Sequence, residues 1–323
     1  MRYRKLGKTG MDVSVIGLGT WQMGNGSYWN ANLDDRESIK TIRTAVDHGV
    51  NLIDTAHVYG AGHSEEVVGK AVQEIGRDKV ILTTKVGIWY EPDGEYNEAT
   101  KCLKCDERVV MTQIEQSLKR LRTDYLDFYQ IHYAGTTPIE ESTAAMQKLV
   151  MQGKIRHWGV SNYNYEQLEK VLSLGYVCSY QPQYSLLFRD NQKKIDLCAR
   201  NNVGVLTYGS IAGGILSGKY RSKEDLPKDG RGGTYPYYQG EAFEKTMELL
   251  KTLDEVANAH NCPVSQVAVN WVIQQPGITT ALVGMKSPAQ AIANASAADW
   301  MLTDEELRLI NQTHDKLFGV PER

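Results

Sequence analysis

Four side chains that can exchange protons lie at the ends of short apolar segments in the first half of the chain. Asp54 ends VNLID, Lys85 follows ILTT, and His132 follows FYQI. Tyr59 comes five residues after Asp54, in AHVYGAG, where the chain can bend back over the same opening. An unpaired carboxylate or ammonium costs on the order of several kcal/mol to bury. We therefore expect Asp54 and Lys85 to form a buried ion pair beside the phenol of Tyr59.

This combination suits proton transfer to an oxygen atom. A phenol has a pKa of about 10, and a neighbouring ammonium favours the phenolate, so we expect Lys85 to lower the pKa of Tyr59. His132 would donate a hydrogen bond that polarises a carbonyl group. Each residue alone has an ordinary structural explanation, such as a helix cap, a snorkelling lysine or a satisfied core histidine. Together they favour proton delivery to an alkoxide while another molecule supplies hydride to the carbon.

Eight apolar, β-branched segments alternate with eight amphipathic segments along the chain. The expected strands cover residues 13–20, 50–56, 79–87, 125–133, 155–162, 177–185, 203–210 and 279–285. The expected helices cover residues 34–49, 64–76, 106–122, 139–153, 164–175, 191–202, 264–275 and 287–297. This alternation predicts an α/β fold, a (β/α)8 TIM barrel whose active site lies at the carboxyl ends of the strands. A doubly wound sheet is less well supported, because GLGTWQMGNG lacks a G-x-G-x-x-G turn that opens a helix.

Three segments fall outside this repeat. YRKLGKTGMDVSVIG has a Lys-Thr-Gly turn between two short β-like runs, which predicts an N-terminal β-hairpin able to close the bottom of the barrel. Residues 213–261 have a polar first half and a helical second half. Thr303, followed by Glu305 and Glu306, predicts the start of an extra C-terminal helix. No interdomain linker is evident, so we expect residues 1–323 to form a single barrel domain.

Composition excludes several functions. The net charge is -3, from 36 Lys and Arg against 39 Asp and Glu, and neither sign forms a long run. This argues against a nucleic-acid binder and a basic membrane-surface protein. No apolar stretch suits a signal peptide or a membrane span, so we expect a cytoplasmic protein. Five cysteines do not suggest a disulfide framework, and the single CxxC of Cys102 and Cys105 is more typical of free thiols than of a metal site. We expect no metal.

Motifs spread along the chain point to a known family. GLGTW, NLIDTAHVYG, SEEVVGKA, TTKVG, DYLDFYQIHY, GKIRHWGVSN, QPQYS and GMKSPAQAIANAS occur in this order. From about residue 3 to residue 315, the sequence resembles the aldo-keto reductases, a (β/α)8 family that reduces carbonyl compounds with NADPH. The resemblance implies a catalytic tetrad of Asp54, Tyr59, Lys85 and His132. In that family the tyrosine is the general acid and base, the lysine and aspartate tune it, and the histidine orients the carbonyl.

The resemblance also implies a site for most of the cofactor. The nicotinamide end would meet Gly19, Thr20, Trp21, Ser161, Asn162, Gln183 and Tyr208. Among these, the serine, asparagine and glutamine would hold the carboxamide, and the tyrosine would stack on the ring. The pyrophosphate would follow Gly209, Ser210, Ile211, Gly213 and Lys219, because exposed N–H groups and a lysine bind anions.

The last expected strand would bind the other end of the cofactor. Gly284 and Lys286 precede a helix that starts at Pro288, and a helix N-terminus is a favourable place for a phosphate. Gln290 and Asn294 are four residues apart on one helical face, from which they can reach adenine. A cation at Lys286 favours the 2′-phosphate of NADPH, so we expect NADP(H) rather than NADH.

The substrate is expected to be a small carbonyl compound, with its class left open. Aromatic side chains on the strand-end loops would line its pocket, namely Trp21, Tyr28, Trp29, Trp89, Tyr90, Tyr133 and Phe188. Such a wall accepts apolar carbonyls and sugar faces alike. The segment TYPYYQG, residues 234–240, either lines this pocket or packs inside the protein. The sequence does not indicate an oligomeric state.

Two other functions are compatible with these residues. The potassium-channel β subunits resemble the same family and hold NADPH while regulating a partner, and such a role fits every cofactor residue. A Schiff-base aldolase would use Lys85 as its nucleophile at a barrel strand end, although Asp54 favours a protonated lysine. Steady NADPH oxidation with small aldehydes would favour the reductase. Borohydride trapping of a substrate on Lys85 would favour the aldolase.

Overall fold

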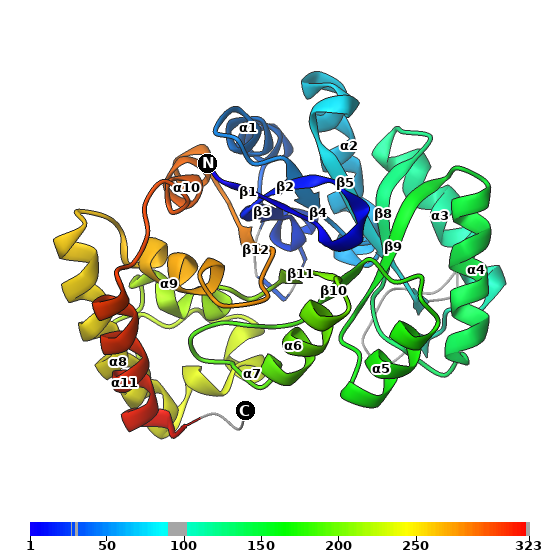
Figure 1. Cartoon of the computed structure of the whole chain (residues 1–323). Coiled ribbons are helices and arrows are strands. Elements are labelled where there is room, and N and C mark those ends of the chain that lie inside the picture. Colours follow the sequence, from blue (N-terminus) through cyan, green and yellow to red (C-terminus); the bar gives the residue numbers. More distant parts are fainter. Residues whose placement is uncertain (27, 30–31, 90–101, 321–323) are drawn as a thin grey trace.

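Eight parallel strands close into a barrel at the centre of the molecule (Figure 1). The computed structural model describes residues 1–26, 28–29, 32–89 and 102–320. The barrel strands are β3 Ile16–Gly19, β4 Leu52–Asp54, β5 Ile81–Val86, β8 Leu126–Ile131, β9 Ile155–Ser161, β10 Ser179–Gln181, β11 Gly204–Thr207 and β12 Thr280–Gly284. β3 pairs with both β4 and β12, with Ile16 beside Ala281, and so closes the sheet. The predicted barrel is confirmed.

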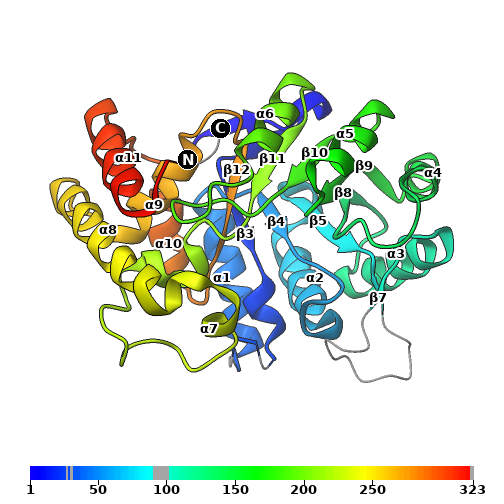
Figure 2. The same ribbon diagram turned by 90° about the horizontal axis from the view of Figure 1, so that it is seen from below.

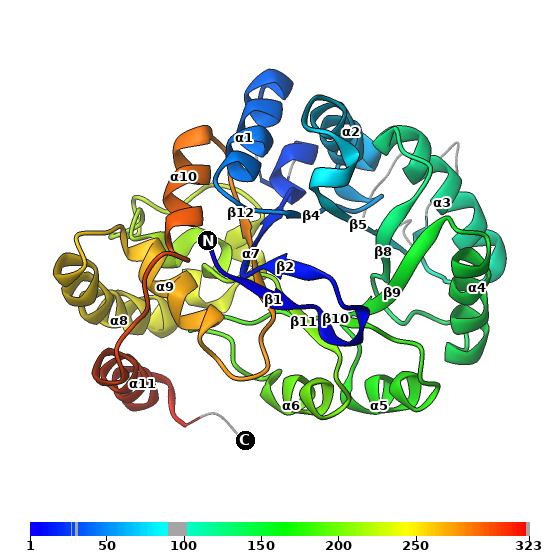
Figure 3. The same cartoon turned by 45° about the horizontal axis from the view of Figure 1, so that its top comes forward.

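A ring of helices covers the outside of the barrel (Figure 3). These are α1 Asp35–Asp47, α2 His63–Ile75, α3 Glu107–Leu121, α4 Ile139–Met151, α5 Tyr165–Ser173, α6 Gln192–Arg200, α9 Val264–Ile273 and α10 Pro288–Ser296. Polar residues at their starts fix several boundaries, as when Asn164 and Gln167 form a capping box before α5. Each of the eight predicted helices is present.

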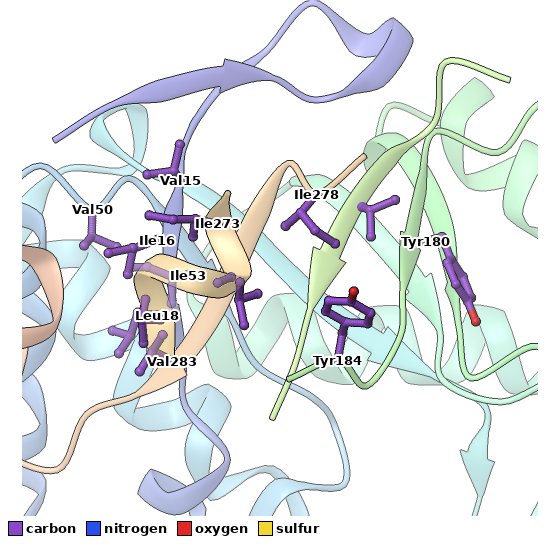
Figure 4. Close-up of a cluster of buried hydrophobic side chains, with 14 of the residues drawn as sticks. Val15, Ile16, Leu18, Val50, Ile53, Tyr180, Tyr184, Ile273, Ile278 and Val283 are labelled. Atoms are coloured by element: carbon purple, nitrogen blue, oxygen red, sulfur yellow. The ribbon is translucent and has the colours of Figure 1, made fainter. Parts of the chain in front are cut away.

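Two apolar cores hold the strands in place. The outer core lies between strands and helices, and Figure 4 shows part of it, with Ile16, Leu18 and Ile53 close to Val50 and Val283. The inner core lies inside the barrel at the amino ends of the strands and consists of Leu6, Val13, Leu52, Phe128, Leu206 and Leu282. Since apolar side chains fill this end, polar chemistry is confined to the carboxyl end.

The N-terminal hairpin supplies two of the inner-core residues. β1 Tyr3–Lys5 and β2 Asp12–Ser14 pair antiparallel, and Leu6 and Val13 reach into the barrel. The Arg4 guanidinium donates to the carbonyls of Ile278 and Ile273 at 2.6 and 2.7 Å, which ties the hairpin to the last barrel repeat. Figure 2 shows the N-terminus near one end of the barrel, with α7 and β7 near the other. The predicted hairpin is confirmed.

Additional elements cover one side and the carboxyl end. α8 Gly240–Ala259 and α11 Asp304–Phe318 pack outside α9, and Thr303 forms the predicted cap of α11, with Glu306 as its capping-box partner. α7 Arg231–Thr234 precedes α8. The short pair β6 Ile88–Trp89 and β7 Cys102–Leu103 was not predicted. Within the described ranges, none of the helices has the length and apolar character needed to cross a bilayer.

Candidate active site

The carboxyl ends of β4 and β5 bring three of the expected catalytic residues together. Asp54 ends β4, and Lys85 lies one residue before the end of β5. Lys85 Nζ donates to Asp54 Oδ2 at 2.7 Å, to the Thr55 carbonyl at 2.8 Å and to the hydroxyl oxygen of Tyr59 at 3.2 Å. Asp54 is 3% exposed and Lys85 1%. The expected buried ion pair is present, and its cation contacts the phenol.

Burial determines the proton affinity of Tyr59. Desolvation raises the pKa of Tyr59 well above its usual value, and the Asp54 carboxylate and Tyr133 add to the rise. The Lys85 ammonium opposes this rise but is outweighed. Burial likewise lowers the pKa of Lys85, against the pull of Asp54. The prediction of a lowered pKa for Tyr59 is therefore wrong, because it left out desolvation of the phenol. Tyr59 is a neutral phenol that can donate its proton to a more basic oxygen.

His132 and two other rings surround this phenol. His132 directly follows β8, and its ring centroid lies 6.2 Å from that of Tyr59 at an interplanar angle of 83°. Tyr133 stacks on His132 at 5.0 Å, and Trp21 stacks on Tyr59 at 5.8 Å. All four expected tetrad residues thus lie at one end of the barrel. An oxygen atom placed between Tyr59 and His132 could meet polar groups of both.

Two residues outside the tetrad hold Asp54 in place. Gln181, the last residue of β10, donates from Nε2 to Asp54 Oδ1 at 2.9 Å. The buried hydroxyl of Thr20, just after Gly19 at the end of β3, bonds to the Asp54 carbonyl at 3.0 Å and to Ser64 Oγ at 2.8 Å. The sequence argument missed Gln181; from the same motif it named only Gln183, as a cofactor residue. The signal for Gln181 is its place at the end of an apolar strand.

The ends of β9 and β11 are joined by a side-chain network. Asn162 has φ 57°, and its Nδ2 donates to the His132 carbonyl at 3.1 Å while its Oδ1 accepts from Tyr208 Oη at 2.7 Å. Ser161 Oγ donates to the Gln181 carbonyl at 2.8 Å. Gln183 forms a backbone bridge with Tyr208, and its carbonyl accepts from Asn191. This network fixes the ring of Tyr208 close to the tetrad.

The loop after β11 has the expected glycine-rich form. Gly209 and Gly213 have φ values of 71° and 66°, and a Cβ added at Gly213 would lie 2.5 Å from the Tyr235 ring. The buried Ser210 hydroxyl donates to the Leu282 carbonyl at 3.2 Å, and Ile211 is half-buried. A side chain at Gly213 would therefore displace its neighbours, and the Gly213 carbonyl already accepts from Arg231 Nη1 and Tyr238 Oη, both at 3.0 Å.

Lys286, just before α10, lies within electrostatic range of two other cations, Arg231 and Lys219. Burial lowers the pKa of the half-buried Lys286, the positive charges of Arg231 and Lys219 lower it further, and the Asp229 carboxylate opposes them. Arg231 forms an ion pair with Asp229 at 2.7 Å. The sequence argument missed Arg231, the first residue of α7, because it lies among glycines in a segment noted only for its polar composition. Excess positive charge at a helix N-terminus attracts phosphate groups.

The side chains expected to reach adenine hydrogen-bond to the backbone just before α10. Ser287 caps α10 by accepting from Gln290 N–H at 3.3 Å, and Gln290 Oε1 accepts from Lys286 N–H at 2.8 Å. Asn294 is buried and donates to the carbonyl of Gly284 at 3.5 Å. This hydrogen bond uses only Oε1 of Gln290. The adenine assignment of both residues stays a prediction.

Aromatic residues of the loop after β3 lie against the tetrad. Tyr28 stacks on Trp21 at 4.5 Å, and Trp29 packs edge-on against Trp21 at 5.2 Å. Tyr133, in the loop after β8, is 38% exposed. Phe188 is half-buried in the loop before α6. Of the other pocket candidates, the side chain of Trp89 and all of Tyr90 lie outside the described residues. Trp21 is thus the ring that joins this aromatic group to Tyr59.

Two further sequence features are part of the protein interior. Tyr235, Tyr237 and Tyr238 are buried, and the first two stack at 5.4 Å, which supports the packing interpretation of TYPYYQG. Cys105 is fully buried in the outer core, where desolvation raises the pKa of its thiol. The side chain of Cys102 lies outside the described residues. In the described ranges no group of three or more His, Cys, Asp or Glu is arranged to hold a metal.

Another buried charge pair lies behind the loop that carries Tyr59. Glu65, in the first turn of α2, is fully buried and accepts from Arg120 Nε at 2.7 Å and from Thr84 Oγ1 at 2.6 Å. Arg120 Nη2 also lies 2.6 Å from His57 Nδ1. Burial and the adjacent Arg120 charge lower the pKa of His57 to about 3. His57 is therefore a neutral imidazole that accepts from Arg120. The sequence argument missed this cluster.

The lowered pKa of His57 predicts acid sensitivity. The unfolded chain binds a proton at His57 below about pH 6.5, whereas the folded chain binds it only below about pH 3. The free energy of unfolding is therefore unaffected by this proton at pH 7 and declines as the pH falls through 6.5. Relative to a His57→Gln variant, the wild type should lose about 2 kcal/mol of unfolding free energy between pH 7 and pH 5. Urea denaturation at both pH values measures this difference. Equal pH slopes for the two proteins would contradict it.

Comparison with known proteins agrees with this arrangement. The family model "Aldo/keto reductase family" matches residues 15–315. The chain is 37% identical to aldo-keto reductase YhdN of Bacillus subtilis, over 99% of this chain and 96% of that one. It is 30% identical to the NADH-specific methylglyoxal reductase of Escherichia coli, over 98% and 99% of the two chains.

Solved structures share the fold. The glycerol dehydrogenase AKR11B4 of Gluconobacter oxydans superposes with a TM-score of 0.89 and 33% identity, over 99% of this chain and 97% of that one. An aldo-keto reductase of Klebsiella pneumoniae in complex with NADPH gives a TM-score of 0.75 and 30% identity, over 100% and 96%. Since the family model and both relatives span nearly the whole chain, the protein belongs to the aldo/keto reductase family of oxidoreductases.

Proposed function

We propose that this protein reduces an aldehyde or ketone, including sugar or aromatic carbonyls, to the alcohol with NADPH, and that Tyr59 is the proton donor. The main support is the contact in which the Tyr59 hydroxyl oxygen accepts from Lys85 Nζ, which is held by Asp54. Because the oxygen accepts from Lys85, the phenolic hydrogen is free to point toward a substrate. A buried neutral phenol is also in the protonation state that a donor needs.

The proton transfer can be followed on this chain's own atoms. The substrate carbonyl oxygen would lie between Tyr59 Oη and the His132 ring, where hydrogen bonds polarise it. As the carbonyl carbon is reduced, its oxygen becomes basic enough to take the phenolic proton. The resulting phenolate stays beside the Lys85 ammonium, which stabilises it. Trp21 covers one face of the Tyr59 ring and limits access of water.

The chemistry of the surrounding donors fits a nicotinamide dinucleotide, which would supply the hydride when bound. The Tyr208 ring, fixed by Asn162, offers a flat face near the tetrad. The backbone of residues 209–213 would hold the pyrophosphate. Lys219, Arg231 and Lys286 bring three positive charges to one region, where Asp229 is the carboxylate that offsets them. This excess charge suits phosphate groups.

Lys286 should distinguish NADPH from NADH. Only NADPH brings a 2′-phosphate to the N-terminus of α10, and a charge-assisted contact is worth roughly 1.5–3 kcal/mol. Lys286→Ala should therefore weaken NADPH by about 10- to 100-fold and NADH by about twofold or less. Fluorescence titration measures both affinities. Lys286→Arg is the matched control that keeps the charge. Equal losses for the two cofactors would mean that Lys286 does not contact the 2′-phosphate.

The proposed activity is tested by NADPH oxidation with a panel of carbonyl compounds. The panel should include small aldehydes, aromatic aldehydes and open-chain sugars, because the aromatic loop after β3 accepts all three classes. Oxidation of the matching alcohols at high pH tests the reverse direction. Tight NADPH binding without turnover of any carbonyl would argue against a reductase and in favour of a cofactor-holding regulatory role.

A further inference from the structure

The Glu65–Arg120–His57 cluster lies directly behind the loop of residues 55–62, which we call the tyrosine loop. Its carboxylate is fully buried, its guanidinium is 18% exposed, and its imidazole is buried. The proton path described above does not use these groups. Burying charge is costly unless each charge is paired and hydrogen-bonded, and both conditions are met here. The role of the cluster is therefore indicated by its contacts with the tyrosine loop and with β5.

Arg120 contacts the tyrosine loop on both sides of Tyr59. Two residues before Tyr59, His57 Nδ1 lies 2.6 Å from Arg120 Nη2. Three residues after Tyr59, Gly62 lies against the guanidinium, since a Cβ added there would be 2.6 Å from Arg120 Nε. Gly62 also has φ 99°, a conformation that favours glycine. The side chain of Arg120 is thus a support for the turn that presents Tyr59.

Glu65 connects the same support to the strand that carries Lys85. Glu65 Oε1 accepts from Thr84 Oγ1 at 2.6 Å, and Thr84 is the residue before Lys85 on β5. Glu65 Oε2 holds Arg120. One carboxylate therefore joins β5 to the guanidinium under the tyrosine loop. Its charge also raises the pKa of Lys85, in addition to the larger effect of Asp54.

We propose that Arg120 is a positioning residue for the proton donor: held by Glu65, it sets the tyrosine loop at the height where Tyr59 Oη meets Lys85 Nζ. This inference rests on the proposed function, in which Tyr59 is the acid. A shift of about 1 Å in a reacting group can cost on the order of 100-fold in rate. The contact between Tyr59 and Lys85 is 3.2 Å long, so a small displacement of the loop would break it.

The test compares two variants of His57 that leave the Glu65–Arg120 pair intact. His57→Leu removes the acceptor that ties the tyrosine loop to Arg120, whereas His57→Gln keeps an acceptor. We expect kcat for carbonyl reduction to fall about 10- to 100-fold in His57→Leu and to stay close to wild type in His57→Gln. NADPH affinity, measured by fluorescence titration, should be unchanged in both because neither variant touches the cofactor residues.

The pH profile of alcohol oxidation gives a readout that a merely structural role would not move. The titratable groups that act on Tyr59 are Lys85 from β5, Asp54 from β4, His132 and Tyr133 after β8, and Tyr208 after β11. Loss of the Lys85 contact removes the cation that stabilises the phenolate, so the limb that reports deprotonation of Tyr59 should move to higher pH in His57→Leu. In His57→Gln it should stay in place.

A second pair of variants tests the guanidinium itself. Arg120→Lys can still pair with Glu65 but lacks a second nitrogen that could donate to His57 at the same time. We therefore expect the same fall in kcat as in His57→Leu. Arg122→Lys is its control, because Arg122 lies at the same end of α3 but donates to Gln73 on the surface of α2. If Arg120→Lys does not fold, the two His57 variants are sufficient to test the positioning role of Arg120.

The inference is overturned if wild type reduces carbonyls and His57→Leu keeps both its kcat and its pH profile. It is also overturned if His57→Gln is as impaired as His57→Leu, since the retained acceptor would then be irrelevant. A wild type that binds NADPH but reduces no carbonyl would instead contradict the proposed function. The two failures are therefore distinguishable.

Discussion

Tyr59→Phe should lower kcat for carbonyl reduction by about 10²- to 10⁴-fold, the usual contribution of a general acid. The variant keeps the ring that stacks on Trp21 at 5.8 Å and loses only the hydroxyl that accepts from Lys85. Without that hydroxyl, the proton would have to come from another donor, such as His132 or water. NADPH affinity should change by about twofold or less, because Tyr59 is outside the cofactor assignments.

The measurement is single-turnover NADPH oxidation with saturating carbonyl, together with fluorescence titration of the cofactor. Tyr3→Phe is a suitable control, because Tyr3 lies on the hairpin at the closed end of the barrel, where its hydroxyl donates to the Gly49 carbonyl. If Tyr59→Phe kept more than about a tenth of the wild-type rate, Tyr59 could not be the principal acid.

Lys85→Met should damage both stability and activity. Removing the ammonium leaves the Asp54 carboxylate buried with Gln181 as a remaining donor, and breaking a buried pair from one side costs about 3–5 kcal/mol. The proton donor also loses the cation that stabilises its phenolate, so kcat should fall by about 100-fold or more. Urea denaturation and steady-state kinetics measure the two losses separately.

The double variant Asp54→Asn with Lys85→Met separates these effects. Since it removes both charges, it should regain most of the lost stability, because a buried pair replaced by neutral groups is often close to neutral in free energy. Its kcat should stay low, because no cation remains beside Tyr59. Recovery of activity together with stability would show that the pair serves only the fold.

The arrangement of elements could be predicted because its signals are local. Apolar and amphipathic periodicities located the eight strands and eight barrel helices, and Ser287 and Thr303 marked two helix starts. Asp54, Lys85 and His132 were found by their places at strand ends, because barrel topology brings those ends together.

The rest of the site depends on packing that a linear pattern does not contain. Nothing in the motif QPQYS shows that Gln181 reaches Asp54; this contact follows from the position of Gln181 at the end of β10. The raised pKa of Tyr59 depends on complete burial, which no single segment specifies. The hydrogen bond between Arg120 and His57 joins the end of α3 to the tyrosine loop, and these two segments are far apart in the sequence. Such contacts follow from the closed barrel and not from any one of its repeats.

During synthesis, β3 leaves the ribosome early, whereas β12, its second partner in the barrel, is synthesised much later. Ile16 pairs with Ala281, and the N-terminal ammonium pairs with Asp299, so both contacts need almost the whole chain. At roughly 5–20 residues per second, the wait from one strand to the other is on the order of 10 to 50 s. Through that interval β3 presents an unpaired edge, which is a template for unwanted association. Most of the translation time of these residues therefore passes before the barrel around Tyr59 can close.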